Sequence, residues 1–122
     1  YKLKILGIIA LEDPIRKGIK ESISTCYKAG IRTILITGDS GKTASGIARK
    51  IGLNNPDIYL TGEEIESMAD EELNKKILFT NLFVRVYPSH KARIVSLLQK
   101  NGNVVAMTGD GINDAAALKK LT

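Results

Sequence analysis

The chain has 122 residues, enough for one compact domain and too few for two substantial ones. Its apolar share of 43% excludes a disordered tail. The net charge of +5 is spread among acidic residues instead of forming a basic run, and few aromatic residues are present to stack on bases. We therefore expect no nucleic-acid partner, and a single domain over residues 1–122.

The first part of the chain predicts a strand and then a helix. Residues 5–10 form an apolar run of strand length. Asp13 and Pro14 supply a helix cap and a first-turn proline, and Gly30 ends the helix. Apolar residues recur between them at steps of three and four: Ile15, Ile19, Ile23, Cys26 and Tyr27. Cys26, the only cysteine, is expected to be a buried small hydrophobe and fits a reducing compartment.

The rest of the chain repeats this alternation. Strands are predicted at residues 33–36, 82–86 and 104–107. Helical stripes are predicted over residues 44–51, 65–73 and 94–98, and residues 54–57 are expected to form a turn. Strands that alternate with helices of this length predict an α/β fold with a doubly wound parallel sheet. The apolar run at residues 3–11 is too short to span a bilayer, which takes about 20 apolar residues.

A Thr-Gly-Asp triplet follows two of the predicted strands, at residues 37–39 and again at 108–110. Ligands of open parallel sheets bind beyond the carboxyl ends of the strands, and glycines there let the backbone approach a ligand closely. One such triplet alone is better explained as a polar turn with a capping Asp. The second copy favours a shared ligand site.

Two carboxylates, Asp110 and Asp114, stand four residues apart across a glycine turn, with Asn113 between them. Such oxygen donors suit Mg²⁺, which usually takes one or two protein carboxylates and keeps places for water and phosphate. The alternative gives Asp114 a capping role and leaves Asp110 in solvent. The density of Gly and Asp over residues 108–114 favours the metal site.

Lys91 stands where the strand at residues 82–86 gives way to a helix, so its ammonium could neutralise a phosphoryl group. Spacing alone leaves a solvated lysine as the alternative. His90 is the only histidine and has no second histidine or cysteine to share a metal with. We expect His90 to be a surface residue.

Together these segments resemble, over nearly the whole chain, the phosphorylation domain of P-type cation-transporting ATPases, a branch of the haloacid dehalogenase superfamily. The Thr-Gly-Asp-Gly-Ile-Asn-Asp sequence at residues 108–114 is the most specific match. Residues 37–39 match a second motif and residues 13–16 a third, in the expected order. Residues 83–91 look most like the calcium-pump branch. The resemblance implies a Rossmann-like, haloacid dehalogenase-type fold.

The resemblance also implies roles for single residues. Asp110 would be a direct Mg²⁺ ligand and a catalytic residue, with Asn113 and Asp114 supporting the metal and its water. The hydroxyl of Thr37 would bond the phosphoryl oxygens, and Lys91 would pair with their charge.

Further positions would serve the bound nucleotide and phosphate. Gly38 would present its backbone N–H to the phosphoryl group, and Gly109 belongs to the second glycine turn of the same site. Asp39, Asp13 and Arg16 would lie toward the nucleotide and the domain hinge.

In the family, an aspartate receives the γ-phosphoryl group of ATP and loses it to water, while membrane helices move ions. The parent would therefore be an ATPase that uses Mg²⁺ and ATP and carries a cation. Its nucleotide-binding and membrane domains would be the partners of a cytosolic domain such as this one. The family nucleophile lies in an Asp-Lys-Thr-Gly-Thr motif that these 122 residues lack, and Asp13 is a poor substitute because Pro14 has no N–H. Ala116 replaces a proline common in the family.

The chain opens on Tyr1 and stops on Thr122 within a helical pattern, so we expect a piece of a longer protein that cannot be phosphorylated alone. In the superfamily the nucleophile strand lies between the two strands that precede the Thr-Gly-Asp triplets. Without it, these strands are expected to close on each other, to borrow residues 1–11, or to drive association. Two other functions stay open: a free-standing phosphatase of the same superfamily, and a non-catalytic module that binds Mg²⁺ and phosphate.

Overall fold

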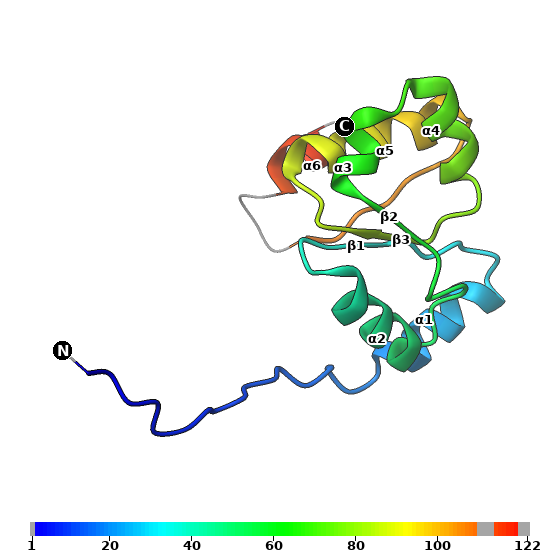
Figure 1. Ribbon diagram of the computed structural model, residues 1–122. Helices are drawn as coiled ribbons and strands as arrows, with labels where there is room; N and C mark the ends of the chain where they lie inside the picture. The colour runs from blue at the N-terminus through cyan, green and yellow to red at the C-terminus, as the bar shows by residue number, and fades with distance from the viewer. Residues whose placement is uncertain (1, 110–113, 120–122) are drawn as a thin grey trace.

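The computed structural model describes residues 2–109 and 114–119, which form a parallel sheet between two layers of helices (Figure 1). α1 (Ile19–Lys28) and α2 (Gly41–Ile51) cover one face of the sheet. The other face carries α3 (Gly62–Ser67), α4 (Asp70–Ile77), α5 (Pro88–Lys100) and α6 (Ala115–Lys119). No helix among these residues is long and apolar enough to cross a membrane.

In the described part of the chain the sheet has three strands in the order β1, β3, β2: β1 (Leu35–Ile36), β3 (Leu82–Val84) and β2 (Tyr59–Thr61). Both pairings are parallel. β3 is central and its three side chains are fully buried, because a parallel strand covered on both faces needs apolar residues on both. Phe83 belongs to the core on the α3–α5 side, and Leu82 and Val84 to the core under α2. The predicted parallel α/β sheet is confirmed.

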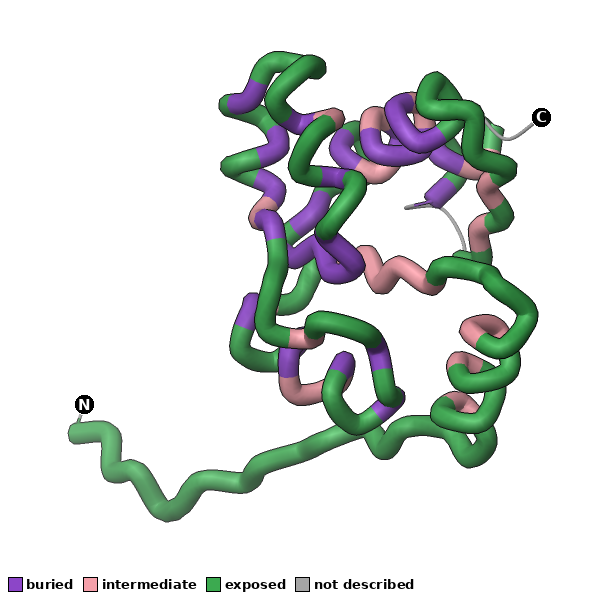
Figure 2. The backbone as a smooth tube through the Cα atoms, turned by 90° about the vertical axis from the view of Figure 1, so that its right-hand side faces the viewer, coloured by how far each residue is buried: buried purple, intermediate pink, exposed green. Residues whose placement is uncertain are grey.

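Two predicted strands are not strands in the structure. Residues 2–11 run as an exposed, extended segment away from the body of the domain (Figures 1 and 2). Residues 104–107 pair with no described strand, although Val105 packs against the same hydrophobic core as Ile34 and Ile36. The expected closing of residues 33–36 on 104–107 therefore does not occur, and neither does the borrowing of residues 2–11. The outer edge of β1 carries no ladder within the described ranges.

The helix predicted from Asp13 begins only at Ile19. Gly18, at φ 87°, has a left-handed backbone that a continuing helix cannot contain. Residues 13–16 are exposed. Cys26 is half-buried, so the prediction that it would be buried was wrong. None of the residues of α1 is fully buried. α1 thus covers its face of the sheet loosely.

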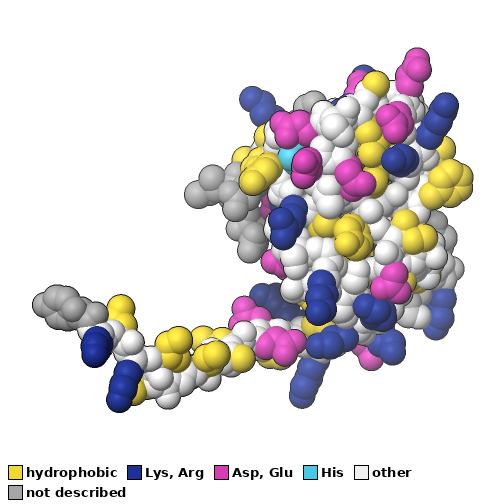
Figure 3. Space-filling model, viewed as in Figure 1, with side chains coloured by type: hydrophobic (Ala, Val, Ile, Leu, Met, Phe, Trp, Pro, Cys, Tyr) yellow, Lys and Arg dark blue, Asp and Glu magenta, His cyan; other side chains and the backbone are white. Residues whose placement is uncertain are grey.

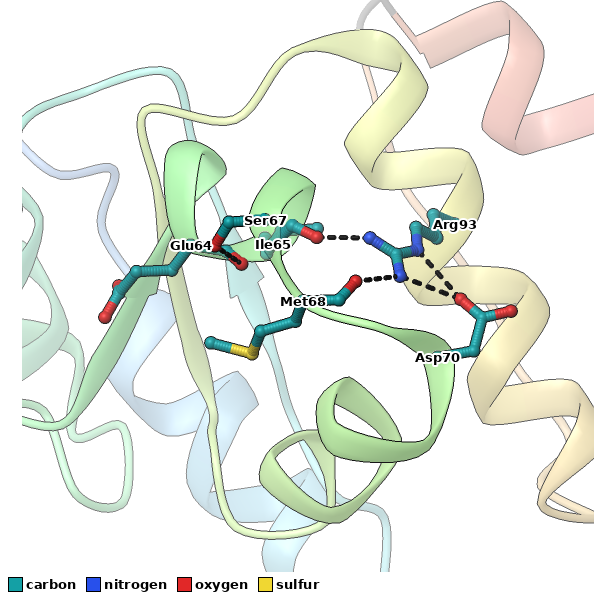
Figure 4. Close-up of polar contacts among 6 residues, drawn as sticks. All are labelled: Glu64, Ile65, Ser67, Met68, Asp70 and Arg93. Atoms are coloured by element: carbon teal, nitrogen blue, oxygen red, sulfur yellow. Dashed lines mark hydrogen bonds and ion pairs between the residues drawn. The ribbon is translucent and has the colours of Figure 1, made fainter.

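The single helix predicted over residues 65–73 is two helices, α3 and α4, broken at Met68 and Ala69, which are both extended. Arg93 of α5 explains why the break is stable (Figure 4). Its guanidinium donates to the carbonyls of Ile65 and Met68, which end α3, and to the carboxylate of Asp70, which begins α4. One planar donor thus satisfies the backbone groups that the break releases.

A second arginine, Arg32, makes side-chain hydrogen bonds at the amino ends of β1 and β3. The Arg32 guanidinium donates to the carbonyls of Ile77 and Thr80 at 2.7 Å each and to the amide oxygen of Asn81 at 2.8 Å. The residue stays exposed to solvent on one side, and its partial desolvation by burial lowers the pKa of Arg32. Arg32 therefore holds the entry of β1 against the end of α4, away from the carboxyl ends of the strands.

Candidate functional site

The carboxyl ends of β1 and β3 are joined by two backbone hydrogen bonds beyond the ladder. The N–H of Val86 donates to the carbonyl of Thr37 at 3.1 Å, and the N–H of Arg85 donates to the carbonyl of Asp39 at 2.9 Å. The hydroxyl of Thr37 accepts the N–H of Asp39 at 3.1 Å, which tightens the turn after β1. The Thr-Gly-Asp turn is thus fixed against the segment that leads into α5.

A surface hollow of about 580 Å³ lies at this junction. Two of the residues that line it, Gly38 and Lys91, belong to the site predicted from the sequence. The others are Ser40, Arg85, Val86, Tyr87 and Pro88. The hollow therefore stands where open parallel sheets bind ligands.

Lys91 and Asp114 form a largely buried ion pair beside the hollow. The Lys91 ammonium lies 2.6 Å from Asp114 Oδ1, and the two side chains are 14% and 7% exposed. Gly109 lies against the same carboxylate, since a Cβ there would come within 2.2 Å of Asp114 Oδ2. The structure thus brings Lys91 of α5 together with Gly109 and Asp114 of the segment at residues 108–114, and all three are predicted site residues.

Other predicted site residues lie elsewhere. Asp13 and Arg16 are exposed in the segment before α1 and do not line the hollow. Their neighbour Glu12 pairs with Lys50, at the far end of α2 from Gly38. Asp39 is exposed on the turn after β1. Asp110 and Asn113 lie outside the described residues.

Two features of the site were missed in the sequence. Arg85 lines the hollow in a left-handed conformation, φ 48°, which is uncommon for a side chain of this size. The signal for Arg85 was a charged residue inside an otherwise apolar predicted strand. His90, expected at the surface, is only 6% exposed, so that prediction was wrong. A lone histidine after a proline gives no sign of burial.

The side chains of Asp114 and Lys91 decide whether the described site could hold a hard cation. Asp114 offers a buried carboxylate, the donor type that Mg²⁺ prefers, and Lys91 beside it would also meet an anion bound with the metal. In residues 2–109 and 114–119 no group of three or more His, Cys, Asp or Glu side chains is placed to hold a metal. Mg²⁺ usually takes only one or two protein carboxylates, so the type of donor at Asp114 suits it, and Asp110, the second carboxylate predicted from the sequence, lies outside the described residues.

The sequence matches the family model of haloacid dehalogenase-like hydrolases over residues 1–122. The chain belongs to the haloacid dehalogenase-like hydrolase family. Within this family of hydrolases, the chain is 50% identical over 117 residues to the calcium-transporting ATPase lmo0841 of Listeria monocytogenes. It is 44% identical over 119 residues to the human calcium-transporting ATPase type 2C member 1. These matches cover 95% and 97% of the chain, which spans 13% of the length of each relative.

Proposed function

We propose that the chain is part of the phosphorylation domain of a P-type ATPase that transports calcium, and that its hollow receives the phosphoryl group of ATP. The observation that carries the proposal is the buried Lys91–Asp114 pair at the strand-end hollow. A buried ion pair is costly to desolvate and is weak evidence for stability alone. Its place beside Gly38, and the calcium-transporting relatives at 44–50% identity, support a role in binding.

In this proposal Lys91 neutralises the phosphoryl charge, and its ammonium has three donors, so it can serve Asp114 and a phosphoryl oxygen together. Gly38 offers its backbone N–H and Thr37 its hydroxyl. Asp110 and Asp114 hold Mg²⁺, which when bound supplies positive charge to the phosphoryl oxygens.

The remaining predicted residues are proposed to serve the nucleotide. Asn113 and Gly109 support the metal turn, while Asp39, Asp13 and Arg16 face the nucleotide in the whole protein. Asp13 and Arg16 would have to reach it together with parts of the parent beyond these residues. The partners are then ATP, a transported calcium ion, and the nucleotide-binding and membrane domains of the same protein on the cytosolic side.

The test measures ATP-dependent uptake of labelled calcium by membrane vesicles. The vesicles carry the complete protein that contains these 122 residues. We expect uptake in the wild type and loss of most of it in Lys91→Ala. Lys100→Ala is the matched control, since Lys100 lies in the last turn of the same helix, and it should retain uptake. ATP hydrolysis without calcium uptake, or equal loss in both variants, would contradict the proposal.

A second experiment uses the 122-residue chain alone. Because it has no Asp-Lys-Thr-Gly-Thr motif, incubation with labelled ATP and Mg²⁺ followed by acid quenching should leave no label on the chain. A label that hydroxylamine removes would show that an aspartate of this chain is itself phosphorylated, and Asp13 would be the first to test.

A further inference from the structure

His90 is a buried titratable side chain that the proposed chemistry does not use. Its ring Nδ1 accepts the backbone N–H of Tyr87, the residue before α5, at 3.1 Å. The side chain thus reaches back over the first turn of its own helix and satisfies an N–H that the helix leaves unpaired. A glutamate or glutamine at this position does the same in capping boxes.

The imidazole is confined by a second element. A Cβ at Gly62, the first residue of α3, would come within 2.9 Å of His90 Nδ1 and 2.2 Å of the carbonyl oxygen of Arg85. The ring therefore lies between the start of α3 and the turn that joins β3 to α5. The centroid of the Tyr87 ring lies 5.5 Å from the centroid of the imidazole, and the two ring planes are tilted by 49°.

The charges around the ring are few. His90 Nε2 lies 3.8 Å from the carboxylate of Glu66 on α3, which is 78% exposed. The turn before α5 and the first turns of α5 also carry Arg85, Tyr87, Lys91 and Arg93; of these, Tyr87 contacts the ring, and Asp114 pairs with Lys91. Lys91 is engaged by Asp114, and Arg93 by Asp70 and two carbonyls.

The hydrogen bond fixes the tautomer. Because Nδ1 is an acceptor, the neutral ring carries its proton on Nε2, toward Glu66. A second proton would occupy Nδ1 and face the N–H of Tyr87, so that two donors would oppose each other. Protonation therefore removes the cap of α5.

The cap matters for the adjacent Lys91. The N–H of Lys91 donates to the carbonyl of Tyr87 at 3.2 Å, so the same turn sets where its side chain starts. From there the ammonium reaches Asp114 and the hollow. We propose that neutral His90 is a positioning residue, which holds the first turn of α5 so that Lys91 serves the anion site, and that its protonation weakens anion binding. The part concerning the anion rests on the proposed function.

The first test is nuclear magnetic resonance of the whole chain, in which the single histidine gives an unambiguous signal. In the neutral ring we expect Nδ1 unprotonated and Nε2 protonated. On acidification the Tyr87 amide and the Lys91 side chain should change in step with the His90 ring. A proton on Nδ1 of the neutral ring, or a Lys91 signal that does not change when His90 titrates, would overturn the inference without any anion present.

The second test measures binding of sulfate, whose charge stays constant, at two pH values on either side of the His90 transition that the resonance experiment records. Wild-type affinity should fall by about fivefold at the lower pH, the factor expected from the loss of one capping hydrogen bond. His90→Gln keeps an acceptor and cannot charge, so it should bind like the wild type at the higher pH and lose no more than the background at the lower.

His90→Leu removes the acceptor and should bind weakly at both pH values; if it does not fold, the glutamine comparison still decides. Tighter sulfate binding by the wild type on acidification, relative to His90→Gln, would mean that the imidazolium attracts the anion, and would overturn the inference. If no variant binds sulfate at all, the proposed anion site fails, while the coupled titration of Lys91 still decides the role of His90.

Discussion

The Lys91 ammonium and the Asp114 carboxylate lie 2.6 Å apart in a part of the fold where both are almost shielded from water. The pair joins α5 to the start of α6 across 23 residues of sequence. If one of two buried charges is removed, the other is left with neither a partner nor full hydration, which is costly in free energy.

Breaking this pair should therefore cost stability. Lys91→Met leaves the Asp114 carboxylate buried and unpaired, and we expect a loss of about 3 kcal/mol in the free energy of unfolding, measured by urea denaturation. Adding Asp114→Asn should recover most of the loss. The control is Lys76→Met, which breaks the exposed pair with Glu72 and should cost about 0.5 kcal/mol or less. A loss for Lys91→Met no larger than for the control would show that the pair is solvated.

Arg93 should be equally sensitive, for a different reason. Arg93→Ala leaves the carbonyls of Ile65 and Met68 without their donor and should cost about 3 kcal/mol. Arg93→Lys should recover little, because one ammonium cannot replace the planar fork. Arg49→Ala, which breaks an exposed pair with Asp57, should cost about 0.5 kcal/mol. Full stability of Arg93→Lys in urea denaturation would show that the charge alone suffices.

The chain should bind Mg²⁺ weakly, because few protein carboxylates are available and no phosphate helps. Asp110→Asn should abolish the binding measured by titration calorimetry, and Asp114→Asn should reduce it. Glu66→Gln removes an exposed carboxylate outside the hollow and should have no effect. Equal losses in all three variants would indicate diffuse attraction of the cation and no site.

The chain should also associate in solution. Residues 3–11 expose six large apolar side chains, each at least 88% exposed, and Figure 3 shows apolar side chains along this segment: Leu3, Ile5, Leu6, Ile8, Ile9 and Leu11. The outer edge of β1 has no strand partner among the described residues, so its backbone groups could pair with such a segment. Light scattering should show a mass that rises with concentration, and Leu6→Lys with Ile8→Lys should lower it. A monomer at all concentrations would contradict this.

The sequence predicted those elements whose patterns are local. β3 was evident because Leu82, Phe83 and Val84 form a buried apolar run, and α5 because Pro88 opens it. β2 has only three residues and was not predicted. The break between α3 and α4 was invisible because it depends on Arg93, which is distant in the sequence.

The site shows the same division. The glycine turns and Lys91 were found because each follows a predicted strand. The burial of His90 depends on Gly62, which is distant in the sequence, so it could not be read from neighbouring residues. Residues 104–107 have the apolar pattern of a strand but pair with no described strand. Strand pairing is a tertiary property, which an apolar run does not specify by itself.

α1 contributes no fully buried residue, and its apolar side chains cover the core under α2 only in part. The cost of opening a segment rises with the apolar surface it buries, so this helix forms a cooperative unit of low local stability. We expect α1 to open at a lower cost than β3 and α5, which carry fully buried side chains. We therefore expect the hollow formed by the ends of β1 and β3 to persist when α1 opens.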